Sequence, residues 1–259
     1  MDNEQITFYA SPTKLSTFLE CPRKYWYYYL NPPTRYKQPE YPYFTLGNTV
    51  HDTLKYFFML KPPLRTKEKL LEMLERFWGM KTGIKGGFKS EEEEKRYKER
   101  AVSMLNNFFQ NEDTILTPLI WQKSKNPQAQ ITPNLFFNGV FDRLDQLPNG
   151  NLHVIDYKTG KEDAEDGHNL QLPMYALMAE KIFQKKVSLV SFLNLESGNW
   201  DTKELEPSYS EEVLRRVQKI ISWIPDSFEK DQFRCKSEKC NHCDYLIDLG
   251  FSIDDRLSV

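Results

Sequence analysis

The sequence predicts an α/β protein in which a central mixed β-sheet is flanked by helices. Residues 133–160 read as two strands joined by a tight turn. Residues 186–195, KVSLVSFLNL, have the β-branched and apolar content of a buried strand. Helical patterns precede and follow these strands, at about 47–60, 66–79, 90–110, 168–184 and 209–224.

Composition sets the class of protein and its size. The chain has 259 residues, of which 39% are hydrophobic, 28% charged and 14% aromatic. That composition predicts one folded domain spanning 1–259, with a helical elaboration over 61–110. The formal net charge is −2, which excludes a global polycation and leaves room for a local basic groove.

Targeting signals are missing from the N-terminal sequence. MDNEQITFYA has neither the basic segment nor the apolar segment of a secretory signal. No apolar run approaches the roughly 20 residues that cross a bilayer. The cytoplasm is therefore the expected compartment, and no membrane partner is expected.

The helix starts can be predicted from capping residues. Ser11 and Pro12 are a typical N-cap and first-turn pair, and Pro22 ends or kinks that helix directly after Cys21. Ser90 followed by four glutamates predicts the start of the 90–110 helix, since acids in the first turn suit the helix dipole. That charged run reads as a solvated helix face.

Each strand of the predicted hairpin carries an aspartate. In the second strand, Asp156 and Lys158 project from one face because side chains alternate along a strand. A two-residue turn at Asn149–Gly150 would pair Asp142 with Tyr157. A three-residue loop, or one bulge, would instead place Asp142 opposite Asp156. Pro148 cannot donate a ladder hydrogen bond, so we predict the longer loop.

Two close carboxylates and a lysine have a specific chemical use. The carboxylates repel unless a cation or a shared proton lies between them, and Mg²⁺ or Mn²⁺ meets that need. Lys158 can stabilise developing negative charge or help deprotonate water. Together these groups predict phosphodiester hydrolysis. The alternative is a surface hairpin with ordinary ion pairs, such as Asp142 with Arg143.

The segments GVFDRLD (139–145) and VIDYKTG (154–160) resemble motifs II and III of the PD-(D/E)xK nuclease superfamily, in its RecB/AddB-like branch that includes CRISPR-adaptation exonucleases. LGNTVHDTLKYF (46–57) resembles the G-x-x-x-H helix of that branch, and LQLPMYALM (170–178) its Q-x-x-x-Y segment. SPTKLSTFLECPRKYWYYYL (11–30) resembles its opening segment. The resemblance runs from about residue 10 to 250 and implies a restriction-endonuclease-like core.

The resemblance also implies roles for the matched positions. His51, Asp142, Asp156 and the backbone carbonyl of Tyr157 would bind the metal, with Lys158 as the catalytic lysine. Gln171 and Tyr175 would contact DNA near the scissile phosphate. Taken alone, His51 would be an ordinary helix histidine, Gln171 a surface residue and Tyr175 a core contact.

Four cysteines lie at the two ends of the chain. Clustered cysteines in a reducing compartment are more often metal ligands than disulfides. In the related branch, one early and three late cysteines hold a [4Fe–4S] cluster, which would join the two ends here. The late spacing C-x4-C-x2-C in the segment 233–250 departs from the branch's C-x2-C-x5-C, and Leu249 stands at the expected last position. The resemblance implies a [4Fe–4S] cluster, with zinc as the alternative, held by Cys21, Cys235, Cys240 and Cys243.

The early segment also concentrates cations among tyrosines. Cations contact phosphates and aromatic rings stack on exposed bases, which suits single-stranded DNA. The alternative is an aromatic core with cations whose stems lie along it. The cations are Lys14, Arg23, Lys24, Arg35 and Lys37, and we expect Arg23 and Lys24 to bind DNA.

The features together predict a metal-dependent DNA nuclease, an exonuclease acting on single-stranded ends in recombination, repair or CRISPR adaptation. Such a protein would work alone or beside a helicase or a recombination or CRISPR protein. The rival hypothesis is a non-catalytic DNA-binding or scaffold subunit of a nuclease–helicase assembly that retains the fold. A third is a structural iron–sulfur or zinc protein.

Overall fold

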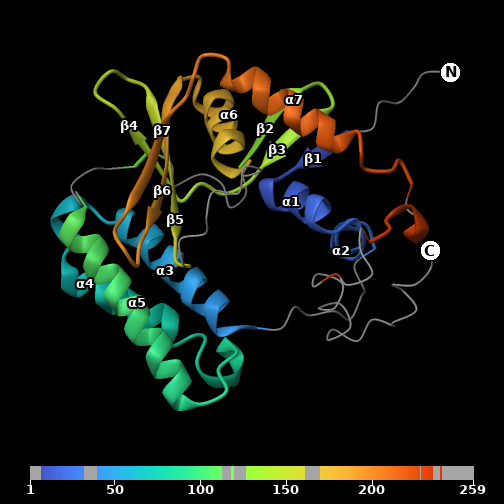
Figure 1. Cartoon of the computed structure of the whole chain (residues 1–259). Helices are drawn as coiled ribbons and strands as arrows, with labels where there is room; N and C mark the ends of the chain where they lie inside the picture. The colour runs from blue at the N-terminus through green and yellow to red at the C-terminus, as the bar shows by residue number, and fades with distance from the viewer. Residues whose placement is uncertain are drawn as a thin grey trace.

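The computed structural model describes residues 7–31, 40–112, 118–119, 127–160, 170–227, 229–235 and 240. It confirms the α/β class, with helices on both sides of mixed β-structure (Figure 1). The strands form two mixed sheets rather than one. The larger has the order β4-β5-β6-β7 and the smaller β1-β3-β2.

The larger sheet consists of β4 (Arg143–Gln146), β5 (Leu152–Lys158), β6 (Val187–Asn194) and β7 (Trp200–Glu204). The central pair, β5 and β6, is parallel, and both outer pairs are antiparallel. Parallel neighbours require a crossover connection, and α6 (Gln171–Phe183) supplies it. The predicted strand 186–195 and helix 168–184 are therefore confirmed with slightly shorter bounds.

The smaller sheet consists of β1 (Phe8–Ala10), β2 (Gln128–Thr132) and β3 (Leu135–Asn138). It divides the first strand of the predicted hairpin, because β3 pairs with β1 and β2 whereas β4 pairs with β5. Residues 139–142 lie between the two sheets and outside both ladders. Asp142 is thus at the point where the chain passes from one sheet to the other.

Three helices cover one face of the larger sheet (Figure 1). They are α3 (Pro42–Phe58), α4 (Lys67–Trp78) and α5 (Glu91–Asn111), with short 3-10 turns η2 (Pro62–Leu64) and η3 (Gly83–Gly86) between them. Their buried residues pack on Ile155 and Tyr157 of β5, on Leu193 of β6 and on Leu195, which directly follows β6.

The opposite face packs against α1 (Pro12–Glu20), α6 and α7 (Tyr209–Ile221). The other alternate residues of β5, Leu152 and Val154, belong to this second core. Strand β5 is therefore buried on both faces. Its polar residues Asp156 and Lys158 lie near its C-terminal end, where the two apolar cores end.

The cap predictions hold for both serines. Ser11 Oγ accepts from the Lys14 amide at 3.1 Å, and Ser90 Oγ accepts from the Glu93 amide at 3.2 Å. Helix α3 begins at Pro42, five residues before the predicted start at 47, since proline suits the first turn of a helix.

The aromatic run after Cys21 is helical, as the alternative of an aromatic core helix expected. It forms α2 (Pro22–Tyr25) and a π-helical turn, η1 (Trp26–Leu30). Near the other end of the chain, η4 (Lys230–Gln232) is a single 3-10 turn. Within the described ranges, no helix is both long enough and apolar enough to cross a membrane.

Candidate active site

The register of β4 against β5 sets the position of Asp142. The ladder pairs Arg143 with Ile155 and Gln146 with Leu152, and it closes through a Leu147 N–H bond to Asn151 O at 2.8 Å. The loop has three residues, 148–150, as predicted. Continuing the ladder by one residue places Asp142 opposite Asp156, so the predicted alignment of the two aspartates is confirmed.

Asp142 joins α3 to the end of β5. Its Oδ1 lies 2.8 Å from His51 Nδ1, and its Oδ2 accepts the Tyr157 backbone N–H at 2.8 Å. Helix α3 comes close enough for this contact because Gly47 faces the strand end. A Cβ added at Gly47 would lie 3.2 Å from Thr159 Oγ1, which is tighter than most side-chain contacts.

Asp156, Lys158 and Gln171 form a closed polar triangle. Lys158 Nζ lies 2.8 Å from Asp156 Oδ2 and donates to Gln171 Oε1 at 2.7 Å, while Gln171 Nε2 donates to Asp156 Oδ1 at 2.7 Å. Lys158 Nζ also lies 4.5 Å from the centre of the Phe192 ring. The lysine side chain remains 39% exposed, whereas that of Asp156 is 6% exposed.

Burial and neighbouring charges shift the pKa values of Asp156 and His51. Burial and then the neighbouring Asp142 charge raise the pKa of Asp156 to about 7, although Lys158 and His51 oppose the shift. Burial would lower the pKa of His51, but the adjacent Asp142 outweighs burial and raises it. A buried carboxylate with such a raised pKa, like that of Asp156, binds either a proton or a cation.

Tyr175 lies behind this site rather than on its surface. It is 9% exposed, and its ring packs edge-on against Phe141 at 5.5 Å. Burial, followed by the Asp156 charge, raises the pKa of Tyr175 to about 12, so its hydroxyl keeps its proton. A Cβ at Gly139 would lie 2.4 Å from Tyr175 Cε1. The glycine of GVFD is therefore required by the tyrosine ring.

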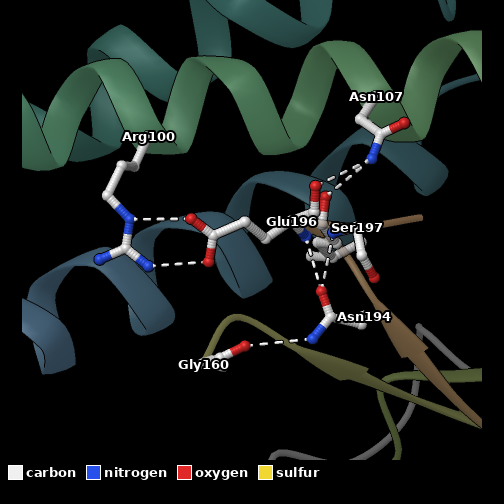
Figure 2. A network of polar contacts seen from close by, with 7 residues as sticks. Arg100, Asn107, Gly160, Asn194, Glu196 and Ser197 are labelled. Atoms are coloured by element: carbon white, nitrogen blue, oxygen red, sulfur yellow. Dashed lines mark hydrogen bonds and ion pairs between the residues drawn. The ribbon is translucent and has the colours of Figure 1, made fainter. Parts of the chain in front are cut away.

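A polar network beyond the predicted residues holds the end of β5 (Figure 2). Asn194 Nδ2 donates to Gly160 O at 3.1 Å, and its Oδ1 accepts from the amides of Glu196 and Ser197 at 3.0 and 2.9 Å. The Leu195 amide donates to Lys158 O at 2.9 Å. The start of the β6–β7 turn therefore positions the backbone on which Lys158 sits.

The same turn is bound to α5 from the other side. Arg100 makes a two-pronged contact with Glu196 at 3.2 and 3.0 Å, and Asn107 Nδ2 donates to Leu195 O and Glu196 O, each at 3.3 Å (Figure 2). Neither Asn194 nor Asn107 was predicted from the sequence. Asn194 could have been found, because its amide side chain directly follows the apolar residues at the end of a buried strand.

The donor set fits a divalent cation. His51, Asp142 and Asp156 offer one imidazole and two carboxylates, and burial beside Asp142 raises the pKa of Asp156. Carboxylate oxygens of this kind are the donors that Mg²⁺ and Mn²⁺ prefer in proteins. Lys158 reaches the same space from the exposed side. The arrangement is suited to polarising a phosphodiester and activating water.

A second histidine has a different environment. His153 Nε2 lies 2.7 Å from Ser191 Oγ, which is 2.8 Å from Thr202 Oγ1. Ser191 is fully buried, so this pair has no access to a substrate and is a structural contact between strands.

Three of the four cysteines come together. The Sγ atoms of Cys21, Cys235 and Cys240 all lie within 4.8 Å of one another, although Cys21 is more than 200 residues away in sequence. Stacking of Tyr25 on Phe233, with ring centres 6.0 Å apart, also joins the two ends. The cluster is a candidate metal site. Cys243 lies outside the described residues.

The predicted DNA contacts of the early segment are placed differently. Arg23 is only 2% exposed, and its Nε and Nη1 have no hydrogen-bond partner within the described part of the chain. The expected contact of Arg23 with DNA stays a prediction, and the burial of its side chain in this structure argues against it. Lys24 pairs with Glu20 at 3.3 Å. Arg35 and Lys37 lie outside the described residues.

Fold and site together place two aspartates and a lysine at neighbouring strand ends of a mixed sheet, beside a helix histidine. A family model for the PD-(D/E)XK nuclease superfamily matches residues 9–247, and the chain belongs to that superfamily.

Two individual proteins are similar to the chain. The CRISPR-associated exonuclease Cas4 of Francisella tularensis subsp. novicida (strain U112) is 31% identical over 98 residues, which are 37% of this chain and 47% of that protein. The match thus spans about half of the relative. A Eubacterium rectale protein, provisionally described as an exonuclease, has a crystal structure that superposes with a TM-score of 0.50 at 14% identity, covering 92% of this chain and 87% of that one. This second likeness bears on the fold alone.

Metal binding should weaken as the pH falls through about 7. Below that value Asp156 holds a proton that a metal must displace, and the raised pKa of His51 adds a second competing proton. We expect the affinity for Mn²⁺ to fall roughly tenfold or more for each pH unit below 7. Calorimetric titration with MnCl₂ between pH 6 and 8 measures this. An affinity independent of pH would contradict the assignment of Asp156 as a ligand.

Proposed function

We propose that the protein is a divalent-metal-dependent deoxyribonuclease, an exonuclease that acts on single-stranded DNA ends. The observation that carries the proposal is the convergence of His51, Asp142, Asp156 and Lys158 on one strand end. Membership of a nuclease superfamily and similarity to a Cas4 exonuclease support it. The biological setting that we propose is recombination, repair or CRISPR adaptation, with a helicase, recombination protein or CRISPR protein as partner.

His51, Asp142 and Asp156, with the Tyr157 carbonyl, would hold Mg²⁺ or Mn²⁺. A bound dication supplies Lewis-acid activation of water and neutralises charge on the phosphate. Asp142 keeps His51 oriented through its 2.8 Å contact, and the Tyr157 N–H in turn orients Asp142. These contacts hold the ligands in place before the metal arrives, which lowers the cost of ordering them.

Lys158 would supply a positive charge to the site in addition to that of the metal. Its ammonium is held by Asp156 and Gln171 yet stays partly exposed, so it can donate to a phosphate oxygen as negative charge develops. Gln171 also fixes the carboxylate of Asp156, which makes it a positioning residue as well as a candidate DNA contact. Tyr175, being buried, would act by packing behind Gly139 rather than by broad contact with DNA.

The test of the proposed function is degradation of end-labelled linear single-stranded DNA beside a closed circular single strand. We expect loss of the linear DNA alone with Mn²⁺ or Mg²⁺, none with EDTA, and a loss of rate of at least about 100-fold in Lys158→Ala. Cleavage of the circle would make the protein an endonuclease.

The rival function is a non-catalytic DNA-binding or scaffold subunit. Absence of cleavage by folded, metal-replete protein that still binds DNA would favour it. The complete set of Asp142, Asp156 and Lys158 argues against it, since a decayed site has no need of three converging charged groups.

We propose that the cysteines hold a [4Fe–4S] cluster through Cys21, Cys235, Cys240 and Cys243, as a link between the two ends of the chain. Among the described residues, the buried Nε and Nη1 of Arg23 have no hydrogen-bond partner, and this guanidinium two residues after Cys21 would suit an anionic thiolate centre. Zinc is the alternative, because sulfur atoms within 4.8 Å also suit one ion bound at about 2.3 Å by each thiolate.

Metal analysis of protein purified without oxygen distinguishes the two. We expect about four iron and four sulfide per chain, with visible absorbance that is lost in Cys21→Ser, together with a lower melting temperature. One zinc and no sulfide would overturn the iron–sulfur assignment. The same purification of Ser16→Ala, a change at an exposed position of α1 outside the cluster, serves as the control.

A further inference from the structure

Three aromatic rings gather at the start of α3, the helix that carries His51. Ring centres are 5.3 Å apart for Tyr41 and Tyr43, with planes at 17°, and 4.5 Å apart for Tyr43 and Phe44. Tyr43 is 52% exposed and Phe44 36% exposed. Large aromatic side chains normally bury most of their surface, so a group of adjoining exposed rings marks a surface for a ligand.

The helix aims this group at the active site. Phe44 and His51 are seven residues apart, which is close to two turns, so they lie on the same face of α3 about 10 Å apart along the axis. The exposed Asn48 lies between them on that face. Gly47, one turn after Tyr43, rests against Thr159, the residue that follows Lys158. The rings and the candidate metal ligands therefore belong to one continuous surface.

A lysine-rich loop flanks the rings. Residues 81–89 contain Lys81, Lys85 and Lys89, and the last two are exposed. The loop is docked onto the start of α3 by the Thr45 hydroxyl, which donates to Gly86 O at 2.9 Å, and by Lys81 Nζ, 3.4 Å from Glu40 Oε1.

Close packing holds that loop in place. Gly87 has φ of 79°, and a Cβ there would lie 2.3 Å from Glu40 O, so only glycine permits the approach. The cationic loop is thus a fixed neighbour of the aromatic group and not a distant appendage.

We propose that Tyr43 and Phe44, the two exposed rings beside Tyr41, form a stacking platform for unpaired bases of the substrate strand, two or three nucleotides from the scissile phosphate. The proposal rests on the proposed function for the identity of the ligand. Exposed rings stack on any base, and neighbouring lysines contact the backbone, the combination that binds single strands without reading sequence. The span of about 10 Å corresponds to roughly three nucleotides that keep the 3.4 Å spacing of stacked bases.

The platform also explains a preference for single strands. Bases within a duplex are covered on both faces by their neighbours, so rings on a helix surface cannot stack on them without unstacking the duplex. A single-stranded end presents free base faces. The platform would therefore select unpaired ends by chemistry that is separate from the metal site.

The experiment compares two double variants by DNA-binding anisotropy in EDTA, where no cleavage occurs. Tyr43→Leu with Phe44→Leu removes the rings and keeps apolar bulk, whereas Tyr43→Phe with Phe44→Tyr keeps both rings. The probes are a labelled single-stranded oligonucleotide and the same strand with abasic sites over three consecutive positions near its end. The ratio of the two dissociation constants is the readout, because it does not depend on the folded fraction.

We expect the wild type and the ring-retaining variant to bind the abasic strand roughly 5- to 100-fold more weakly than the intact strand. The leucine variant should bind both strands alike and the intact strand correspondingly more weakly. A leucine variant that still discriminates the intact from the abasic strand would overturn the platform, as would unchanged affinity, the result expected if the rings bind a protein.

The outcome is separable from that of the proposed function. Degradation of DNA without base-dependent binding through these rings would contradict the platform alone. Base-dependent binding through the rings without cleavage, with any metal, would contradict the nuclease assignment alone.

Discussion

Asp142→Asn is expected to lower the rate of DNA cleavage by at least about 100-fold while leaving the fold intact. Asparagine keeps the shape of the side chain and an oxygen that can accept the Tyr157 N–H, now 2.8 Å from Asp142 Oδ2. It loses the negative charge that His51 contacts and that a hard dication requires. The loss should therefore fall on metal binding and turnover rather than on stability.

The measurements for this variant are the cleavage rate, the affinity for Mn²⁺ by calorimetry and the melting temperature. Asp226→Asn makes the same chemical change at an exposed position after α7 and should leave all three unaltered. Cleavage by Asp142→Asn within tenfold of the wild-type rate would remove Asp142 from the metal site. Loss of cleavage together with a collapsed melting temperature would assign it a structural role instead.

Arg143→Leu is expected to destabilise the protein by about 3–5 kcal/mol. The Arg143 side chain is 3% exposed and pairs with Glu112 at 3.1 Å and with Asp145 at 2.7 Å. It also lies 5.2 Å from the Phe58 ring centre. Its removal leaves two mostly buried carboxylates without their cation, where the end of α5 and the strand β4 meet. Urea unfolding measures the change.

The matched control is Arg100→Leu. Arg100 also contacts a carboxylate, Glu196, at 3.0 Å, but both side chains are 40% exposed or more. Exposed pairs contribute about 0.2–1 kcal/mol, so this variant should unfold close to the wild-type midpoint. Equal destabilisation by the two substitutions would show that burial does not set the strength of the Arg143 network.

The register of the β4–β5 hairpin was predictable from local chemistry. Pro148 disfavours a two-residue turn, and Gly150 with φ of 84° closes the three-residue loop that aligns Asp142 with Asp156. The break in the first strand was not predictable in the same way. Residues 139–142 leave the ladder because β3 finds partners in β1 and β2, and β1 lies more than 100 residues earlier in the chain.

Burial distinguishes two neighbouring cations for which the sequence predicts the same role. Arg23 and Lys24 are adjacent and equally cationic in sequence, yet Arg23 is enclosed and Lys24 pairs with Glu20. A helix turn places neighbouring side chains about 100° apart, so the packing of α2 decides which one is buried. The early tyrosines followed the same rule: Tyr25 and Tyr27 belong to the core.

The sequence by itself determined the α/β class, the helix caps and the three-residue hairpin loop, and it predicted His51, Asp142, Asp156 and Lys158 as the candidate site. Each of these depends on local periodicity, turn chemistry or motif order, all of which are written into neighbouring residues. Only the tertiary structure decided the division into two sheets, the meeting of Cys21 with Cys235 and Cys240, and the exposure of the rings beside the site. Those features depend on contacts between segments that are distant in the sequence. The free energies of such contacts cannot be inferred from a pattern of neighbouring residues.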